Sequence, residues 1–331
     1  MASKSPARPT IYDVAQEAGV SKSLVSLVLN GSDLVSETKR LAVQEAIERL
    51  GYRRSRTASN LARHRSHTIG LVVDNFENPW FAPMLHGLRE TLAPHGLHVA
   101  IREQHISPNH PTAIDEFLES GVDALVVAAE PGHDFADPGV PTVVESTRLH
   151  GITGADLVGS DQLTGANLAV EHLANLGHQH IGHISGEGGA AATRRAGFEQ
   201  AMWARGLEPL VAGRDQDTTE EGGYLGTVEL LRRHPQITAV FAANDMMALG
   251  ARAALREDGR STPRDCALMG YDNSPVARSR LLDLTTIEPC THEVGLRAAE
   301  ALLRRMTEPS APTLNVQITP RLVVRSSSLP A

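Results

Sequence analysis

Three groups of residues in this sequence have types and spacings that could do chemistry, and a glycine-rich run is the first. Gly186-Glu-Gly-Gly189 follows a predicted strand, which is where phosphate-binding loops occur. The run lacks the full G-x-G-x-x-G spacing because position 191 is alanine, so it is a weak sign of a dinucleotide enzyme. The sequence contains no P-loop spacing and no Ser/His/Asp or Cys/His signature. We therefore expect a protein that is not an enzyme.

The second group is the fifteen histidines, which invite a metal-binding hypothesis. His178, His180 and His183 lie around a turn and a strand, and no cysteine or carboxylate stands beside them at ligand spacing. We interpret them as scattered surface and loop histidines. Cys266 and Cys290 are too few for a disulfide scaffold or a cysteine-rich metal site. The expectation is a protein without a metal ion or a cofactor.

The third group consists of aromatic and polar side chains that follow predicted strands. Trp80 and Phe81 come after the first of these strands. An aromatic ring face suits the C–H side of a sugar or a flat base, and surface packing is the alternative. Asn244 and Asp272 stand at the ends of two later strands. Because open α/β sheets bind ligands at the carboxyl ends of their strands, these residues are candidates for a small-molecule site.

Short apolar runs alternate with amphipathic segments from residue 69 onward, and these elements would position such a site. The runs predict buried strands at 69–73, 124–128, 142–144, 181–185, 239–243 and 267–271. Helical patterns lie between several of them, at 84–93, 114–119, 162–176 and 246–256. Strands that alternate with helices form parallel sheets covered on both faces. The pattern predicts an α/β core of two doubly wound parallel-sheet subdomains with a cleft between them.

Residues 1–52 show the different pattern of three short helices. Apolar residues share one face of a helix that Gly19 ends, and Ser21 is placed to cap a second helix that runs to about residue 30. Ser36 caps a third helix, which Gly51 ends. Two short helices joined by a turn that contains glycine are typical of the helix-turn-helix, whose second helix enters the major groove of DNA. A three-helix module that does not bind DNA would show the same periodicity.

Charge separates this head from the remaining chain. Residues 1–66 carry 11 Lys and Arg against 6 Asp and Glu, whereas the whole chain has a net charge of −8. A basic head on an acidic body favours a polyanion as the partner of the head, and a solvated charged helix is the alternative. A chain of 331 residues is longer than one hydrophobic core usually accommodates, so we expect at least two domains. No apolar run in it is long enough to span a bilayer. Because the N-terminus does not look like a secretory signal, we expect a soluble, cytoplasmic protein.

The helix-turn-helix pattern is part of a longer series of motifs. They include TIYDVAQEAGVS at 10–21, VLNG at 28–31, IERLGY at 47–52, AND at 243–245, GYD at 270–272 and LVVR at 322–325. In type and order these motifs resemble those of the LacI family of bacterial transcriptional regulators, over nearly the whole chain. The resemblance implies an all-α head and a periplasmic-binding-protein-like core whose chain crosses three times between two subdomains.

The resemblance also implies where each part of the chain begins and ends. It implies a helix-turn-helix head at 1–52, a hinge at 53–68 that becomes helical on DNA, one subdomain from 69–159 with 291–319, and another from 160–290 with 320–331. Leu61 stands where paired leucines of the family wedge into the minor groove and bend the duplex. The chain departs from the usual hinge pattern of the family at Arg54, Ser55 and Ser59.

At the DNA, the resemblance implies a recognition helix that begins at Ser21. It implies base contacts for Lys22, Ser23 and Leu27, and phosphate contacts or packing for Tyr12, Ser26, Asn30 and Lys39. The family very often has arginine at the position of Leu27. Leucine has no donor and offers only apolar contact, for instance to a thymine methyl group. We therefore expect an altered operator rather than a loss of DNA binding.

In the core, the resemblance implies an effector-binding role for Arg194, with a structural salt bridge as the alternative. An arginine, Asn244 and Asp272 together supply donors and acceptors that fit a polyhydroxylated neutral ligand. We expect a sugar or a sugar derivative, and a purine is the alternative because purine-binding members of the family exist. The family often has an aspartate, an aromatic lid and a glutamine where this chain has Ser146, Thr218 and Pro289. We expect Asp161 to have a structural or signal-carrying role.

These observations predict a ligand-responsive transcriptional regulator, most often a repressor, of genes for sugar uptake or catabolism. It would bind a pseudo-palindromic operator in double-stranded DNA as a homodimer, at the nucleoid and without a membrane. A small-molecule effector would change its affinity for the operator by allostery. A transport-type solute-binding protein shares the core fold but would carry an export signal and no helix-turn-helix. A nonspecific architectural DNA-binding protein would leave the cleft without a purpose.

Overall fold

The computed structural model describes residues 9–29, 32, 34–50, 66–104 and 110–329. The chain forms two compact units, Met1–Ser66 and His67–Ala331. Of the predicted hinge at 53–68, residues 53–65 lie outside the described residues. None of the described helices is both long enough and apolar enough to cross a membrane.

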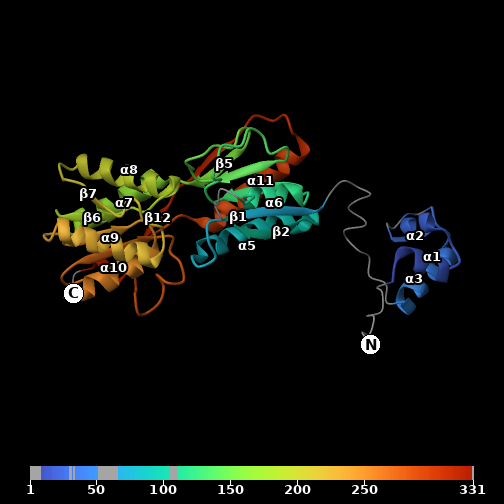
Figure 1. Cartoon of the computed structure of the whole chain (residues 1–331), viewed down its shortest axis with the longest axis horizontal. Helices are drawn as coiled ribbons and strands as arrows, with labels where there is room; N and C mark the ends of the chain where they lie inside the picture. Colours follow the sequence, from blue (N-terminus) through green and yellow to red (C-terminus); the bar gives the residue numbers. More distant parts are fainter. Residues whose placement is uncertain (1–8, 30–31, 33, 51–65, 105–109, 330–331) are drawn as a thin grey trace. The chain divides into compact units, whose positions relative to one another are not determined.

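Short helices make up the described part of the first unit (Figure 1). They pack around a small apolar core. The helices are α1 (Ile11–Glu17), α2 (Lys22–Leu29) and α3 (Glu37–Leu50). Thr10 and Asp13 form a capping box at the start of α1, and Gly19, with a φ of +63°, turns the chain toward α2. The core contains Val14, Ala15, Val25, Val28, Val35, Val43 and Ala46. The helix-turn-helix that the sequence predicts is therefore present.

The second unit contains two six-stranded sheets, and the first is entirely parallel. Its order is β11-β5-β4-β3-β1-β2. Its strands are β1 (Thr68–Val73), β2 (His98–Glu103), β3 (Ala124–Ala128), β4 (Thr142–Glu145), β5 (Asp156–Ser160) and β11 (Asn315–Ile318). The central strands β3 and β4 are buried along their whole length, as expected for a sheet that is covered on both faces.

The second sheet has the order β12-β10-β9-β8-β6-β7. Its strands are β6 (Ile181–Ile184), β7 (Leu210–Ala212), β8 (Ala239–Ala242), β9 (Ala267–Tyr271), β10 (Thr285–Glu288) and β12 (Arg321–Val323). Strand β12 runs antiparallel to β10, a detail that the prediction of two doubly wound parallel sheets did not include. The reason is geometric. The parallel strands of both sheets end at the cleft between them, so a chain that leaves β11 and crosses directly enters the second sheet from its carboxyl edge.

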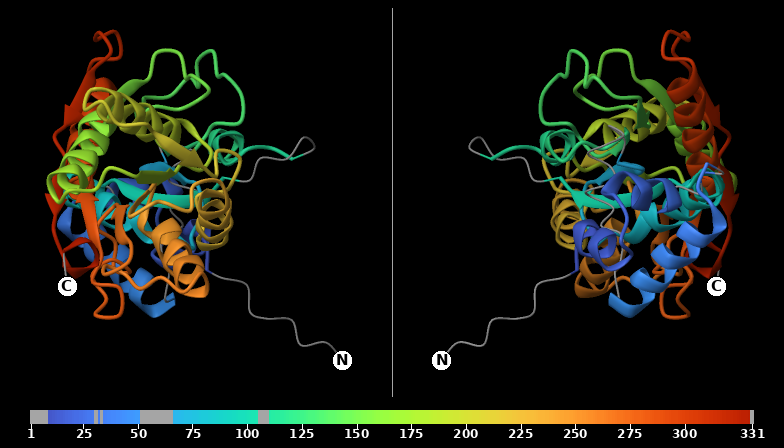
Figure 2. Two further views of the ribbon diagram at one scale, coloured as in Figure 1. Left: turned by 90° about the vertical axis from the view of Figure 1, so that its left-hand side faces the viewer. Right: turned by 90° about the vertical axis from the view of Figure 1, so that its right-hand side faces the viewer.

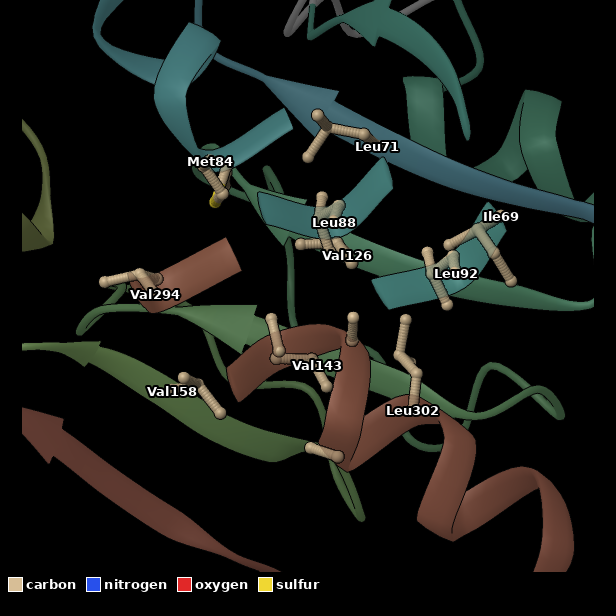
Figure 3. Packing of buried hydrophobic residues seen from close by; sticks show 14 of the residues in the cluster. Ile69, Leu71, Met84, Leu88, Leu92, Val126, Val143, Val158, Val294 and Leu302 are labelled. Carbon is tan, nitrogen blue, oxygen red and sulfur yellow. The ribbon is translucent and has the colours of Figure 1, made fainter. Parts of the chain in front are cut away.

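Helices cover both faces of each sheet (Figures 1 and 2). The first sheet carries α5 (Ala82–Leu92) and α11 (Thr291–Thr307) on one face and α6 (Ala113–Glu119) on the other. The second carries α7 (Gln162–Asn175) and α8 (Gly189–Trp203) on one face, and α9 (Glu220–Arg233) and α10 (Asp245–Glu257) on the other. Figure 3 shows the core under α5 and α11, where Leu71, Leu88 and Val126 pack together.

The path of the chain agrees with the predicted architecture of two doubly wound subdomains. In the described residues the chain passes between the sheets three times, after β5, after β10 and after β11. The six strands predicted from apolar runs match observed strands to within one residue at either end. We call the sheet that contains β1, with its helices, the first subdomain, and the sheet that contains β6, with its helices, the second subdomain.

Candidate functional site

One candidate site is the exposed side of α2 in the first unit. Val25 and Val28 are buried, so Lys22, Ser23 and Leu27 lie on the outer side of the helix. The Leu27 side chain is 41% exposed. An apolar side chain between polar ones on an exposed helix is suited to contact with a base methyl group in a major groove.

Tyr12 of α1 contributes to the same surface. Its side chain is 64% exposed, and Lys22 Nζ lies 5.0 Å from its ring centroid. Lys22 Nζ also donates a hydrogen bond of 3.3 Å to the Tyr12 hydroxyl. The ammonium group is therefore held at the start of α2, beside an aromatic ring, where it is suited to contact a DNA phosphate.

The other predicted DNA contacts have different environments. Ser21 Oγ accepts a hydrogen bond of 3.3 Å from the backbone N–H three residues later, which caps α2. Ser26 is half-buried, and Lys39 is exposed on α3. Two predicted contacts, Asn30 and Leu61, lie outside the described residues. The structure thus brings Tyr12, Ser21, Lys22, Ser23 and Leu27 to the start and the outer side of α2.

A second candidate site is a cavity of about 410 Å³ between the two sheets of the second unit. The residues that line it from the first subdomain include Asp74, Asn78, Trp80, Glu130, Glu145, Arg148 and His150. Those from the second subdomain include Gln162, Gly189, Arg194, Thr218, Asn244 and Asp272. Many of these residues follow the carboxyl ends of strands, where open α/β sheets bind ligands. The volume is in the range of small-molecule sites.

Arg194 lies in the wall of this cavity, and its guanidinium group has several partners. Nε donates a hydrogen bond of 2.7 Å to Gln162 Oε1, and Nη1 donates one of 2.5 Å to the Ala243 carbonyl. Nη2 lies 3.8 Å from Asp272 Oδ1, and the group stands 3.8 Å from the Tyr271 ring centroid. The ion pair considered as an alternative for Arg194 is therefore present, but both of its members also line the cavity.

The adjacent aromatic residues Trp80 and Phe81, both predicted to bind the ligand, lie in different environments. Trp80 lines the cavity, and its Nε1 donates a hydrogen bond of 3.0 Å to Asp74 Oδ1, which fixes the indole ring. Phe81 does not line the cavity and lies in the core of the first subdomain, edge-on to Phe76. The structure therefore does not place Phe81 at this cavity, where the sequence had suggested it. The segment Pro79–Phe81 is a single 3-10 turn, in which successive side chains point in different directions.

Asn244 lines the cavity, but its side chain already has partners. Its Oδ1 accepts a hydrogen bond of 2.7 Å from the Met247 backbone N–H and so caps α10. Its Nδ2 donates one of 2.9 Å to the Thr218 carbonyl. Asn244 therefore joins the start of α10 to the segment before α9 and shapes the wall of the cavity.

A buried ion pair in the cavity was not predicted from the sequence. Arg148 Nη2 lies 2.6 Å from Glu145 Oε2, and each side chain is less than a tenth exposed. Glu145 is the last residue of β4. A carboxylate at the end of a predicted apolar strand is the same signal that selected Asn244 and Asp272, so it could have selected Glu145 as well.

Carboxylates outnumber guanidinium groups around this cavity. Burial raises the pKa of Asp74 and of Glu145, and it raises the pKa of Asp272 well above its usual value. The positive charges of Arg148 and Arg194 offset part of the rise in the pKa of Glu145, and that of Arg194 offsets part of the rise in the pKa of Asp272. The cavity thus disfavours a further negative charge and matches a neutral ligand.

Three polar atoms in the cavity wall are buried and have no hydrogen-bond partner among the described residues. They are Asn78 Oδ1, Arg148 Nε and His150 Nδ1. Buried polar groups in folded proteins nearly always have partners, because leaving one unsatisfied costs about 1–3 kcal/mol. All three belong to residues that line the cavity, but the atoms themselves are covered, so a ligand reaches them only if neighbouring side chains move.

Hydrogen bonds also join the two subdomains next to the cavity. Glu130 Oε1 accepts one of 2.7 Å from the backbone N–H of Gly189, the first residue of α8. Gln162 Nε2 donates one of 3.2 Å to Ser146 Oγ. Because each bond links one subdomain to the other, a movement between the subdomains would change both.

Known proteins resemble this chain in both units. Residues 10–55 match the family described as bacterial regulatory proteins, lacI family, and residues 170–328 match the periplasmic binding protein-like domain. The transcriptional regulator CelR of Thermobifida fusca is 32% identical, over 97% of this chain and 98% of that protein. The solved CelR–cellobiose complex is 30% identical, with a TM-score of 0.68 over 97% of this chain and 100% of that one. The lac repressor dimer bound to operator and the anti-inducer ONPF is 25% identical, with a TM-score of 0.81 over 98% and 100%.

The likeness to CelR spans both units rather than one shared domain. In this chain a helix-turn-helix with an exposed surface comes first, and a core with a polar cavity follows it. The chain belongs to the lacI family of bacterial regulatory proteins and is a ligand-responsive, DNA-binding transcriptional regulator rather than an enzyme.

Proposed function

We propose that this regulator represses genes for sugar uptake or catabolism by binding a pseudo-palindromic operator as a homodimer. A helix-turn-helix reads one half-site, so two copies are needed to read both halves of a palindrome. The lac repressor structure, a dimer on its operator, supports this arrangement. We assign base contacts to α2 and a minor-groove contact to Leu61 of the hinge at 53–68. Such a protein acts on chromosomal DNA, so we place it at the nucleoid in the cytoplasm.

We infer that the effector is a neutral sugar, and the unpartnered atoms of the cavity carry this inference. Asn78 Oδ1 accepts a hydrogen bond, Arg148 Nε donates one, and His150 Nδ1 does either according to its tautomer. Sugar hydroxyl groups both donate and accept, so one class of ligand matches the donor, the acceptor and the imidazole nitrogen once the wall adjusts to it. The Trp80 indole offers a flat face for the C–H side of the sugar ring.

Two other ligand classes fit the cavity less well. A purine is best held between two aromatic faces, whereas Trp80 is the aromatic residue in the described wall and Thr218 stands where an aromatic lid is common. A sugar acid or sugar phosphate would meet the surplus of carboxylates. The structure of the related protein CelR contains cellobiose, which is a neutral disaccharide, and this supports the choice of a neutral sugar.

The sugar acts by changing how the two subdomains close on each other. A ligand bound between them stabilises whichever arrangement it contacts better, and it shifts operator affinity only by that difference. Coupling of this kind is typically about 1–3 kcal/mol. We assign one subdomain of the core to residues 69–159 with 291–319 and the other to residues 160–290 with 320–331. The three chain segments that cross between them bend when the subdomains close.

The first experiment is selection of bound fragments from the source genome at two salt concentrations. We expect one palindromic sequence that persists at the higher salt, because binding to phosphates alone weakens steeply with salt. Recovery of only salt-sensitive, unrelated fragments, with and without sugars, would refute specific operator binding. The genes beside the palindrome then name the sugars to test.

The second experiment measures the effect of neutral sugars, sugar acids and purine bases on operator affinity. We expect one neutral sugar to change the affinity, and Arg194→Ala to abolish that change while leaving sugar-free operator binding intact. Arg205→Ala is the control, because Arg205 is exposed beyond the end of α8 and does not line the cavity. A response to a purine or to a sugar acid alone would refute the ligand class but not the regulatory role.

A further inference from the structure

Three side chains on α5 and α11 bring metal-ligating atoms close together, outside the ligand cavity. His86 Nδ1 lies 3.3 Å from His292 Nε2. Glu90 Oε2 lies 3.1 Å from the same His292 atom and 3.8 Å from His86 Nδ1. We propose that His86, Glu90 and His292 form a binding site for a divalent transition-metal ion such as Zn²⁺.

The spacing of the three atoms matches the size of such an ion. Atoms separated by these distances lie about 2.0 Å from one common point, which is the length of bonds from Zn²⁺ to histidine nitrogen and carboxylate oxygen. Two imidazoles and one carboxylate are also a donor set that Zn²⁺ uses with three protein ligands, and they leave a fourth position open to water. The three ligand atoms are therefore close enough together for one ion to reach all of them.

The backbones of α5 and α11 hold the three ligands in place. A Cβ atom at Gly87 would lie 2.3 Å from the His292 carbonyl oxygen, and one at Gly295 would lie 2.2 Å from the Met84 carbonyl oxygen. The two helices thus touch through their backbones at the level of the site. His86 and Glu90 are four residues apart and so share one face of α5. The distance between the two backbones is therefore fixed before binding, and only the three exposed side chains have to be ordered by the ion.

The chemistry of the donors decides the kind of ion. Imidazole nitrogen suits Zn²⁺, Ni²⁺, Cu²⁺ and Co²⁺, whereas Mg²⁺ and Ca²⁺ prefer oxygen ligands. The site is partly open to solvent, since the His86 side chain is 76% exposed and the His292 side chain 44%. An ion can therefore enter without opening the fold.

Metal binding should stabilise the folded protein, because the ligands come from distant parts of the sequence. His86 and His292 are 206 positions apart, so the unfolded chain does not present them together. An ion that binds the folded state alone stabilises it by RT ln(1 + [ion]/Kd), so the midpoint of unfolding rises with the logarithm of the ion concentration once that concentration exceeds Kd. This effect separates the site from weak binding by exposed single histidines.

The test uses the untagged full chain, freed of metal with a chelator, and titrates it with Zn²⁺ in the presence of excess Mg²⁺. We expect one ion per chain at micromolar affinity and a higher melting temperature. His86→Gln and His292→Gln should each weaken this binding by more than about tenfold, since loss of even an outer partner costs about 10–100-fold. His95→Gln is the matched control, because His95 is exposed just after α5 and outside the cluster.

Substituting Co²⁺ for Zn²⁺ gives a spectroscopic check, because cobalt held by nitrogen ligands in a four-coordinate site has strong visible absorption. That absorption should vanish in His86→Gln and His292→Gln and persist in His95→Gln. Zinc binding that is equal in all four proteins would overturn the proposal, as would a melting temperature that zinc does not raise. Absence of zinc binding in the unsubstituted chain would leave an exposed His–Glu hydrogen-bond cluster only.

Discussion

At the scale of single residues, Asp245 shows how a buried charge is accommodated next to the ligand cavity. It is 1% exposed at the start of α10. Its Oδ2 accepts a hydrogen bond of 2.7 Å from the Ser274 backbone N–H, and its Oδ1 accepts one of 2.7 Å from the Thr286 hydroxyl. Burial nevertheless raises the pKa of Asp245 to about 6, because two hydrogen bonds do not replace its lost hydration.

We predict that Asp245→Asn changes how stability depends on pH. The pKa of Asp245 is higher in the folded chain, at about 6, than its ordinary value of 3.8. Its contribution to stability is therefore complete below pH 3.8 and is lost as pH rises through 6. An asparagine does not titrate, so the free energy of unfolding of the variant should gain about 2 kcal/mol relative to the unsubstituted chain between pH 4.5 and 7.5.

Urea unfolding at the two pH values measures this difference. Asp265→Asn is the control, because hydrogen bonds from Ser261 lower the pKa of the exposed Asp265 to about 2 and it stays ionised throughout this range. A constant difference between Asp245→Asn and the unsubstituted chain at both pH values would show that Asp245 is ionised at pH 4.5 in the folded state.

Leu27 is exposed on α2, at a position where the resemblance to the family led us to expect arginine and a base contact. We predict that Leu27→Arg moves the preferred operator toward guanine at one position in each half-site. A bidentate arginine contact discriminates against other bases by about 1–3 kcal/mol. Selection from random DNA measures the preference. Leu34→Arg adds the same charge at an exposed position outside α2 and should strengthen binding to all sequences alike; a guanine shift there too would remove Leu27 from the base contacts.

At the scale of elements, helices α9 and α10 pack so closely that their contact depends on glycine. A Cβ atom at Gly250 would lie 1.9 Å from the Glu220 carbonyl oxygen and 2.6 Å from the Tyr224 backbone nitrogen. Gly223 meets the Met247 backbone in the same way. Backbone atoms cannot rotate away from a methyl group, so any larger residue at these positions must separate the two helices.

We predict that Gly250→Ala lowers the free energy of unfolding by about 1–3 kcal/mol, as overpacking does, even though alanine favours helix. Denaturant unfolding with an unchanged slope measures the loss. Gly151→Ala is the control, because its nearest neighbour, Asp134 Oδ1, is 3.8 Å from the added carbon and its backbone is not left-handed. If both variants lose the same amount, the close contact between α9 and α10 does not limit stability.

The elements that could be predicted from the sequence are those with a strong local pattern. Continuous apolar runs identified β1, β3, β4, β6, β8 and β9, since strands buried on both faces have no polar side. Strands β11 and β12 are partly exposed and short, and β7 has three residues, so their patterns were too weak to identify. The antiparallel direction of β12 depends on where the chain crosses between sheets, which a local pattern does not contain.

The cavity was predictable only where its residues follow recognisable strands or family motifs. Arg194, Asn244 and Asp272 were selected on those grounds and line it. Phe81 was selected with Trp80 because neighbouring aromatic residues look equivalent in a sequence, whereas a turn sends one into the core. The His86–Glu90–His292 cluster could not be found, because it depends on the packing of two helices that lie far apart in the chain.

At the scale of the whole molecule, the two subdomains of the core must move relative to each other if a ligand in the cavity is to affect DNA binding. Glu130 of the first subdomain holds the second one through its hydrogen bond to Gly189, at the positive N-terminal end of α8. Its other oxygen accepts a hydrogen bond of 2.8 Å from the Leu149 backbone N–H, which orients the carboxylate. Glu130 thus stabilises the arrangement in which the subdomains are in contact.

We predict that Glu130→Ala opens the core and weakens effector binding. A hydrogen bond to a charged group contributes about 1.5–3 kcal/mol, so a loss of even 1–2 kcal/mol would weaken the apparent affinity for a sugar that binds the closed arrangement by about 5–30-fold. Calorimetric titration measures the affinity, and small-angle X-ray scattering of the sugar-free protein measures the opening without reference to any ligand. Glu130→Gln keeps an oxygen that accepts from Gly189 and should show a smaller change in both. If scattering and affinity are unaltered in Glu130→Ala, the contact between subdomains is set by the remaining interface, and Glu130 is not the residue that holds it.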